Sequence, residues 1–387
     1  MAAINKSILL AIILFLSFAL LSCVATLQDP EAEEISKYNI PFEIGELNFT
    51  VEQIQIDFLE MDEIRSMFVF DTINDMILLA VEVYQDTTQV VINEFIFLYD
   101  IIRQEIIAKI DMSGADRLIA DALIFGDMII YVDKNVYRSY IKAYDITSGQ
   151  QTIIRTIQSP WRSEPQLRRV EGGYLVLYID LELSQYGVEF VSHNQEIRIL
   201  YKNSLEYGEP FSPGNFQAFG DRFAFFEAYQ GNEYFFIGNT NGEYQKIQLT
   251  KHVDNFSILA QGLVTSHAYI ENEERLRADV IRYLEFVSFD GQTTARLDGF
   301  RTFRKTTNGN AILGIADWIT EEGYHFYGRP MLIRYANESL YAYLINFHEA
   351  VSVPHFVAVD DNTWFIVSGF PDDERGIDVG VFKLKVE

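Results

Sequence analysis

The stretch RLIADALIFGDMIIYVDKNVYRSYIKAYDITSGQQTIIRTI, residues 117–157, decides the fold. Two turn signals divide it, Gly126-Asp127 and the polar segment that begins at Asp145, and they separate runs rich in Ile, Val, Tyr and Phe. Such runs, bounded by Gly, Asp or Asn, are typical of β-strands joined by hairpin turns. The stretch therefore predicts four consecutive strands, over residues 117–125, 128–132, 139–145 and 151–157.

The first of these turn signals recurs along the chain, each time before a strongly apolar strand. The copies are Asn74-Asp75, Gly126-Asp127, Gly172-Gly173, Gly220-Asp221, Gln261-Gly262, Asn308-Gly309 and Asp360-Asp361. Successive copies are 41 to 52 residues apart, which is the length of a four-stranded propeller blade. Most copies also have an apolar third strand that ends at Asp or Asn, such as Ile141–Tyr144 before Asp145 and Ile197–Tyr201 before Asn203.

These repeats predict an all-β fold, a β-propeller of seven four-stranded blades over residues 46–387. The seventh unit has no chain left for a fourth strand after residues 379–386, whereas residues 47–58 alternate as a strand and precede the first unit. We expect the N-terminal strand to complete the last blade and close the ring, which removes exposed sheet edges. A ring of six or eight blades, or two packed β domains, is the alternative.

The N-terminus has the pattern of a signal segment that ends at the single cysteine, Cys23. Lys6 supplies a positive charge, residues 8–21 are almost entirely apolar, and Ser22 is the small residue before the cysteine. These first 23 residues resemble bacterial lipoprotein signal peptides, which implies cleavage of residues 1–22 and lipid on Cys23. Together with the repeats, they make the chain similar to bacterial β-propeller lipoproteins as a broad class. The alternatives are an uncleaved membrane anchor, for which the apolar run is short, and an ordinary secretory signal.

Residues 23–45 are predicted to be a lipidated tether, because they are acidic and have no apolar period. We therefore expect the protein in the bacterial cell envelope, lipid-anchored to a membrane and facing the periplasm or the surface. With one cysteine there is no internal disulfide, so packing and strand pairing have to hold the domain together.

The composition excludes one class of partner and supports a large core. The net charge is −26, and it becomes −27 when residues 1–22 and with them Lys6 are removed. Such a surface repels phosphates, so we expect no nucleic-acid partner. A hydrophobic content of 49% argues against a disordered acidic chain.

Motifs for chemistry are mostly absent from the sequence. It has no phosphate-binding loop, zinc-type cysteine pair or nucleophile elbow, and its six histidines are scattered, so we expect neither a metal nor a cofactor. Ala143–Gln150 resembles the strand–turn segment of quinoprotein-type propeller repeats, but it occurs once and implies no quinone.

The candidate binding face is predicted from the long connections, because loops longer than pairing requires tend to carry function. Links from second to third strands and between blades emerge together, and the long ones are residues 85–93, 159–165, 181–194, 271–279, 319–330 and 371–378. Two of them combine aromatic with charged residues, as binding surfaces do. Their residues are Trp161, Arg162, Asp317, Trp318, Glu321, Glu322, Tyr324, His325, Tyr327 and Arg329.

Three functions fit this sequence. We favour a non-catalytic binding or assembly scaffold that presents the face to an envelope protein or a glycan. The alternative is a carbohydrate-active enzyme in which Asp317, Glu321 and Glu322 supply paired carboxylates. A structural envelope lipoprotein that contacts its partner through the blade rims is the third.

Overall fold

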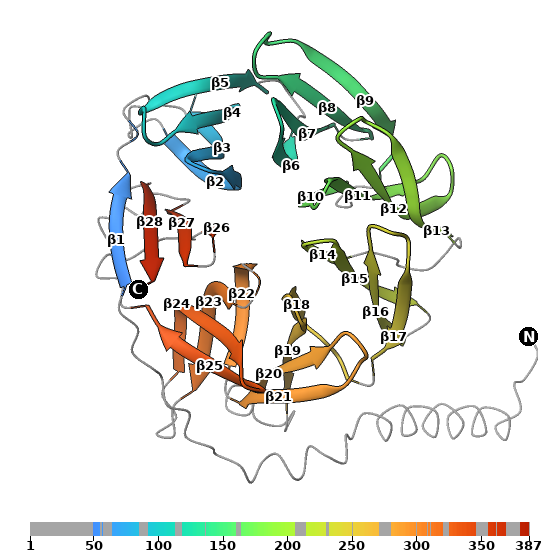
Figure 1. Ribbon diagram of the computed structural model, residues 1–387, viewed down its shortest axis with the longest axis vertical. Coiled ribbons are helices and arrows are strands. Elements are labelled where there is room, and N and C mark those ends of the chain that lie inside the picture. Colours follow the sequence, from blue (N-terminus) through green and yellow to red (C-terminus); the bar gives the residue numbers. More distant parts are fainter. Residues whose placement is uncertain are drawn as a thin grey trace, which may run out of the picture. The chain divides into compact units, whose positions relative to one another are not determined.

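The structure is a computed structural model (Figure 1). It describes residues 49–54, 56, 64–84, 92–112, 118–135, 137–159, 164–205, 214–229, 232–249, 251–270, 280–298, 300–307, 309, 311–319, 325–345, 355–360, 362–368 and 380–386. These residues form strands β1 to β28, arranged as seven four-stranded sheets. Within the described ranges there is no helix, and hence none long and apolar enough to cross a membrane. The predicted seven-bladed propeller is confirmed.

Blades 1 to 4 follow one another along the chain, each with its strands in sequence order. Blade 1 contains β2 (Ile64–Ile73), β3 (Met76–Tyr84), β4 (Ile92–Asp100) and β5 (Glu105–Asp111). Blade 2 contains β6 (Leu118–Phe125), β7 (Met128–Lys134), β8 (Ser139–Asp145) and β9 (Gln151–Ile157). Blade 3 contains β10 (Gln166–Val170), β11 (Gly173–Asp180), β12 (Gln185–Ser192) and β13 (Ile197–Ser204). Blade 4 contains β14 (Gly214–Phe219), β15 (Arg222–Tyr229), β16 (Asn232–Asn239) and β17 (Tyr244–Gln248).

The remaining blades repeat this order until the last one, which takes a strand from the N-terminal side. Blade 5 contains β18 (Asn255–Ile258), β19 (Gly262–Ile270), β20 (Val280–Ser288) and β21 (Thr293–Asp298). Blade 6 contains β22 (Phe300–Thr307), β23 (Ala311–Ile319), β24 (His325–Ala336) and β25 (Ser339–Leu344). Blade 7 contains β26 (His355–Asp360), β27 (Thr363–Ser368), β28 (Gly380–Val386) and, outermost, β1 (Phe49–Ile54).

Most of the propeller lies in one compact unit, Glu43–Ala268 together with Arg282–Glu387. A second grouping joins Met1–Phe42 with Tyr269–Ile281, and of it the structure describes only residues 269–270 and 280–281, which end β19 and begin β20. Cys23 and the predicted signal and tether segments lie outside the described residues, so they stay predictions.

The ring is closed by pairing between the two ends of the propeller sequence. β1 pairs antiparallel with β28 over its whole length, from Phe49 opposite Val386 to Ile54 opposite Val381. In Figure 1 the blue β1 and the red β28 lie side by side at the outside of blade 7. The expectation that the N-terminal strand completes the last blade is therefore confirmed.

The apolar core lies between blades, so each sheet is covered on both faces. The second strand of a blade shows this best, because all eight residues of β11 are buried. A strand buried on both faces reads as a continuous apolar run rather than an alternating one. Between blades 2 and 3, for example, Ile130 and Val132 pack with Tyr174, Val176 and Tyr178. This arrangement explains why the apolar runs after the turn signals were the clearest repeat.

The predicted turns of blades 3 and 5 are shifted by a residue, and in blade 3 the reason is steric. The turn of blade 3 is Glu171-Gly172 rather than Gly172-Gly173, and Gly172 has a positive φ of 79°. Gly173 instead begins β11, where a Cβ would lie 2.2 Å from the Val191 carbonyl oxygen. The second glycine therefore permits close approach of β12, whereas the first permits the turn.

The inner strands are joined from blade to blade by polar side chains. The Asp71 carboxylate accepts a hydrogen bond from the Ile124 N–H (2.9 Å), and Asp121 accepts one from the Leu167 N–H (2.8 Å). Arg168 then pairs with Asp121 (2.8 Å) and donates through Nε to the Phe216 carbonyl oxygen (2.8 Å). These bonds link β2, β6, β10 and β14, so neighbouring blades are fixed at the centre as well as by their apolar faces.

The connections lie at two ends of the propeller, which we name separately. The link face carries the turns between second and third strands, such as residues 135–138 and 181–184, and the links between blades, such as residues 158–165. The hairpin face carries the other turns, such as residues 126–127, 146–150, 171–172 and 193–196. Turns of neighbouring blades contact one another there, since the Glu171 N–H donates to the Gly220 carbonyl oxygen (2.9 Å).

Candidate functional site

On the link face, two short turns of blades 2 and 3 expose large apolar side chains. Tyr137 is 75% exposed in the turn between β7 and β8, and Leu181 and Leu183 are 45% and 59% exposed in the turn between β11 and β12. Exposed apolar groups close together, surrounded by polar residues, are typical of surfaces that bind another molecule.

In each turn, one side-chain oxygen accepts hydrogen bonds from two backbone N–H groups. Asn135 accepts hydrogen bonds through its side-chain oxygen from the N–H groups of Tyr137 (3.0 Å) and Arg138 (2.8 Å). Asp180 accepts in the same way from the N–H groups of residues 182 and 183, at 3.1 and 3.3 Å. Asn and Asp favour such turns because their short side chains replace a backbone acceptor. The exposed apolar side chains therefore stand on turns with defined conformations.

The link between blades 2 and 3 is fixed at both of its ends to these turns. Gln158 accepts a hydrogen bond through its carbonyl oxygen from the Leu181 N–H (2.8 Å), and the hydroxyls of Ser159 and Ser139 are 2.6 Å apart. At the other end, Glu164 forms an ion pair with Lys134, whose side chain is only 5% exposed. Trp161 and Arg162, which we predict in the binding face, belong to this link but lie outside the described residues.

Two ion pairs lie on the strands of blades 2 and 3. Lys142 pairs with Asp133 across β7 and β8, and Arg155 of blade 2 pairs with Glu189 of blade 3. The Arg155 guanidinium also lies 4.2 Å from the centroid of the Tyr178 ring, and burial raises the pKa of that tyrosine. Buried charges are tolerated when each has a partner. The Arg155–Glu189 pair therefore connects the two blades, and the Lys142–Asp133 pair connects two strands within blade 2.

The second predicted group, on blade 6, lies partly in strands rather than in a loop. Asp317 and Trp318 belong to β23, and His325, Tyr327 and Arg329 belong to β24. The prediction of a link over residues 319–330 is therefore wrong: only residues 320–324 separate the two strands. Residues 325–330 extend the ladder, with Arg329 opposite Ala316, because their aromatic residues favour an extended strand.

The first predicted group belongs to the link between blades 2 and 3 and the second to blade 6, and the single binding face predicted for them stays a prediction. Of the carboxylates considered for sugar hydrolysis, Asp317 lies opposite Arg301 in the ladder of β22 and β23. Glu321 and Glu322 lie outside the described residues, as does Tyr324.

Blade 3 is also built differently from its prediction. The sequence placed a long link over residues 181–194 and a third strand over residues 197–201. The structure instead has the third strand β12 at Gln185–Ser192, and residues 197–201 belong to the fourth strand, β13. The turn at Leu181–Ser184 was hidden because two leucines occupy it, whereas turn signals are usually polar. Leu181 and Leu183 lie within the predicted link of residues 181–194, but sequence reasoning singled out neither them nor Tyr137 as binding residues, because isolated apolar residues in a connection give no binding signal.

The described histidines have ordinary neighbours. His193 stacks on Phe125 at 4.6 Å, His267 stacks on Tyr283 at 4.5 Å, and His355 packs edge-on against Phe68 at 4.7 Å. Within the described part of the chain, no three His, Cys, Asp or Glu side chains are grouped so that they could hold a metal.

Comparison with known proteins supports the fold alone. No protein-family model matches the sequence, and no curated protein does. Among solved structures, a prolyl endopeptidase is similar with a TM-score of 0.52 and 7% identity over 84% of this chain, which spans 50% of that chain. The WD40 domain of Toxoplasma gondii coronin has a TM-score of 0.51 and 10% identity, covering 89% of both chains.

A third similar structure is the β-propeller domain of the Trilobed protease from Pyrococcus furiosus, with a TM-score of 0.50 and 10% identity over 82% of this chain and 93% of that one. That domain is described as having an open velcro topology, whereas β1 and β28 pair here. At these identities the comparisons establish a β-propeller and carry no function across.

Proposed function

We propose that this protein is a non-catalytic scaffold that binds an envelope protein or a glycan through the link face of its propeller. The observation that carries this proposal is the exposure of Tyr137, Leu181 and Leu183 on two adjacent turns. A tyrosine beside aliphatic side chains offers a partner apolar contact area and one hydrogen-bonding group.

The arrangement also favours binding because it is rigid before a partner arrives. Asn135 and Asp180 hold the two turns, and the link from residue 158 to residue 164 is fixed to them at both ends. A surface that is already ordered loses less conformational entropy on binding than one that must be ordered by its partner.

The proposal includes a lipid anchor on Cys23, with residues 23–45 as the tether to the propeller. It rests on the apolar run, Lys6 and Ser22 of the N-terminal sequence. A tether of this length leaves the propeller close to a membrane, where an envelope protein or a glycan is the available partner. Replacement of Cys23 with serine should abolish incorporation of labelled fatty acid and release the protein from the membrane fraction.

The binding role is tested by crosslinking in intact cells, followed by identification of the crosslinked partner. A triple variant, Tyr137→Ser, Leu181→Ser and Leu183→Ser, should lose the partner that the wild-type protein captures. The matched control is Ile102→Ser with Tyr244→Ser, which removes side chains that are 71% and 60% exposed elsewhere on the propeller. Loss of the partner in the control together with its retention in the triple variant would refute a link-face scaffold.

A further inference from the structure

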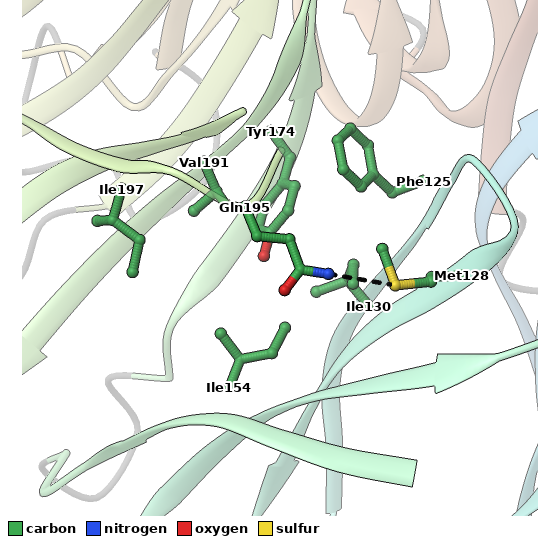
Figure 2. Close-up of a pocket in the computed structure, with 8 residues that line it drawn as sticks. All are labelled: Phe125, Met128, Ile130, Ile154, Tyr174, Val191, Gln195 and Ile197. Carbon is green, nitrogen blue, oxygen red and sulfur yellow. Dashed lines mark hydrogen bonds between the residues drawn. The ribbon is translucent and has the colours of Figure 1, made fainter. Parts of the chain in front are cut away.

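A groove lies between blades 2 and 3 at the hairpin face, the end of the propeller opposite the link face. Figure 2 shows its lining, which includes Met128, Ile130 and Ile154 from blade 2 and Tyr174, Gln195 and Ile197 from blade 3. It holds about 320 Å³ of space, part of which is open to solvent. Only about 40 Å³ of it can be occupied by water-sized spheres, far less than the about 300–1,000 Å³ of sites for whole small molecules, so this groove fits a single side chain better than a cofactor.

One tyrosine side chain, Tyr174, lines the groove. Tyr174 is 2% exposed, and no described residue forms a hydrogen bond with its hydroxyl. Figure 2 shows Tyr174 among the side chains that line the groove, whereas the Gln195 amide is directed to the Met128 sulfur. Burial raises the pKa of Tyr174 to about 12, so the group is a neutral donor at physiological pH. A tyrosine hydroxyl that the protein does not use is available to donate a hydrogen bond to a ligand.

The fold does not require a hydroxyl at this position. Tyr174 is the second residue of the second strand of its blade, and the same position is buried in every blade. Trp364 is the other residue there with a polar atom, and five blades have hydrocarbon side chains. These are Ile77, Ile129, Phe223, Leu263 and Ile312. Phe223 shows that a phenyl ring without the hydroxyl fills this position in the neighbouring blade.

Several carboxylates lie in the hairpin-face turns next to residues that line the groove. Asp127 immediately precedes Met128, Glu196 lies between Gln195 and Ile197, and Glu171 begins the turn before β11. Asp145 stands at the start of the next turn in blade 2. The hairpin-face turns of these two blades, residues 126–127, 146–150, 171–172 and 193–196, include no lysine or arginine. These turns are therefore negatively charged, as is the whole chain, and Arg198, the cation that follows Ile197, donates to the Thr240 carbonyl oxygen of blade 4.

We infer that this groove binds a basic peptide segment of a partner protein, which inserts one apolar side chain between blades 2 and 3. The inserted side chain fills the space against Ile130, Ile154 and Ile197, and the Tyr174 hydroxyl donates a hydrogen bond to a carbonyl oxygen of the segment. Lysine or arginine residues on either side of the inserted residue face Asp127, Glu171 and Glu196. The apolar groove and its hydroxyl select the inserted residue, and the acidic turns select its neighbours.

The probe for this site is a capped pentapeptide, Lys-Lys-Phe-Lys-Lys, added to the full chain labelled at isoleucine δ-methyl groups. Methyl NMR should show shifts at Ile130, Ile154 and Ile197, while Ile77 and Ile312, which belong to other blades, stay unchanged. The central residue and the charges are tested with Lys-Lys-Ala-Lys-Lys and Glu-Glu-Phe-Glu-Glu, and both should bind at least tenfold more weakly. Absence of groove shifts, or equal binding of either comparison peptide, overturns the inference.

Three variants locate the contacts, with affinity measured by calorimetry. Tyr174→Phe should weaken binding about three- to tenfold, the value of one net hydrogen bond, and Phe223 indicates that the ring alone is accepted at this position. Ile197→Glu should weaken binding of Lys-Lys-Phe-Lys-Lys at least tenfold, because it removes the apolar contact with the inserted phenyl group and puts a group that must be desolvated in its place. Ile199→Glu is the matched control, because Ile199 is 56% exposed on the same strand and does not line the groove.

Wild-type affinity in both Tyr174→Phe and Ile197→Glu overturns the inference, as does equal loss of binding in Ile197→Glu and Ile199→Glu. None of these changes touches Tyr137, Leu181 or Leu183 of the link face. A failure of the groove to bind is therefore distinguishable from a failure of the proposed scaffold function.

Discussion

His267 is a buried histidine whose neighbours fix it in the neutral form. Its Nδ1 lies 2.8 Å from the His252 carbonyl oxygen and donates to it, so the unprotonated Nε2 faces the Thr265 hydroxyl at 2.8 Å. Burial lowers the pKa of His267 to about 4, and the positive charges of Lys251 and Arg296 act in the same direction. Glu285, whose Oε2 is 3.6 Å from Nε2, does not outweigh these effects.

This histidine should make the stability of the protein depend on pH. The unfolded chain takes up the proton near pH 6.5, whereas the folded protein takes it up only near pH 4. The contribution of His267 is therefore complete above about pH 6.5 and falls between that pH and about 4, by up to about 1.4 kcal/mol per pH unit. Denaturant unfolding at several pH values should show a shallower slope in His267→Gln than in the wild-type protein.

His193→Gln serves as the control, because it replaces an exposed histidine. It should keep the wild-type slope. An unchanged slope in His267→Gln would mean that this side chain does not take up a proton on unfolding.

The inner strands depend on single carboxylates that bond to the next blade. Asp121 of β6 accepts the Leu167 N–H and pairs with Arg168, both at 2.8 Å, although neither residue belongs to its own blade. Arg169 of the same strand, β10, reaches past blade 2 to Asp71 (3.1 Å) and to the Thr72 carbonyl oxygen (2.8 Å) of blade 1. The inner strands of three blades are thus held by a few charged hydrogen bonds.

Asp121→Ala should lower the free energy of unfolding by about 2–4 kcal/mol, because it leaves a buried N–H and a partly buried guanidinium without their acceptor. Asp121→Asn, which keeps one oxygen acceptor, should cost less. Glu105→Ala changes an exposed carboxylate on the outer strand β5 and should stay within about 0.5 kcal/mol of the wild type. Denaturant midpoints measure all three, and wild-type stability in Asp121→Ala would contradict the role assigned to this carboxylate.

The whole ring depends on contact between strands from opposite ends of the sequence. Six residues of β1 pair with β28, and β1 is the fourth strand of blade 7. Neighbouring blades bury their apolar faces against each other, as Ile77 and Leu79 of blade 1 do against Phe365 and Val367 of blade 7. Separation of β1 from β28 would therefore expose the sheet edge of blade 7 and loosen its packing on blade 1.

A disulfide across this junction should stabilise the entire domain. Glu52 and Lys383 are directly opposite in the register, so Glu52→Cys with Lys383→Cys, in a Cys23→Ser background, places two thiols face to face. In the chain-entropy description, a disulfide that closes so long a loop raises the free energy of unfolding by as much as about 5 kcal/mol, because it lowers the entropy of the unfolded chain. The oxidised protein should unfold at higher denaturant than the reduced one.

Glu52→Cys with Lys385→Cys is the control for this disulfide, because Lys385 lies opposite Thr50 rather than Glu52. It should form the bond poorly. Equal stability of the oxidised and reduced forms of the first pair would show that the junction does not limit unfolding.

The amino-acid sequence by itself determined the blades, their number and the strand that closes the ring. Local signals suffice for these, because each second strand is buried on both faces and follows a turn such as Gly126-Asp127, which makes the repeat visible. The signals fail where a turn is apolar, as at Leu181–Ser184, or where an aromatic run such as residues 325–330 extends a strand beyond its expected end.

Only the tertiary structure decided which surface residues lie together. It placed Tyr137, Leu181 and Leu183 on turns of the neighbouring blades 2 and 3, and it placed Tyr174 in the lining of a groove. The physical reason is that a strand pattern reports burial and turns within one blade. Exposure and hydrogen-bond satisfaction depend instead on the neighbouring blade, which lies about 50 residues away along the chain.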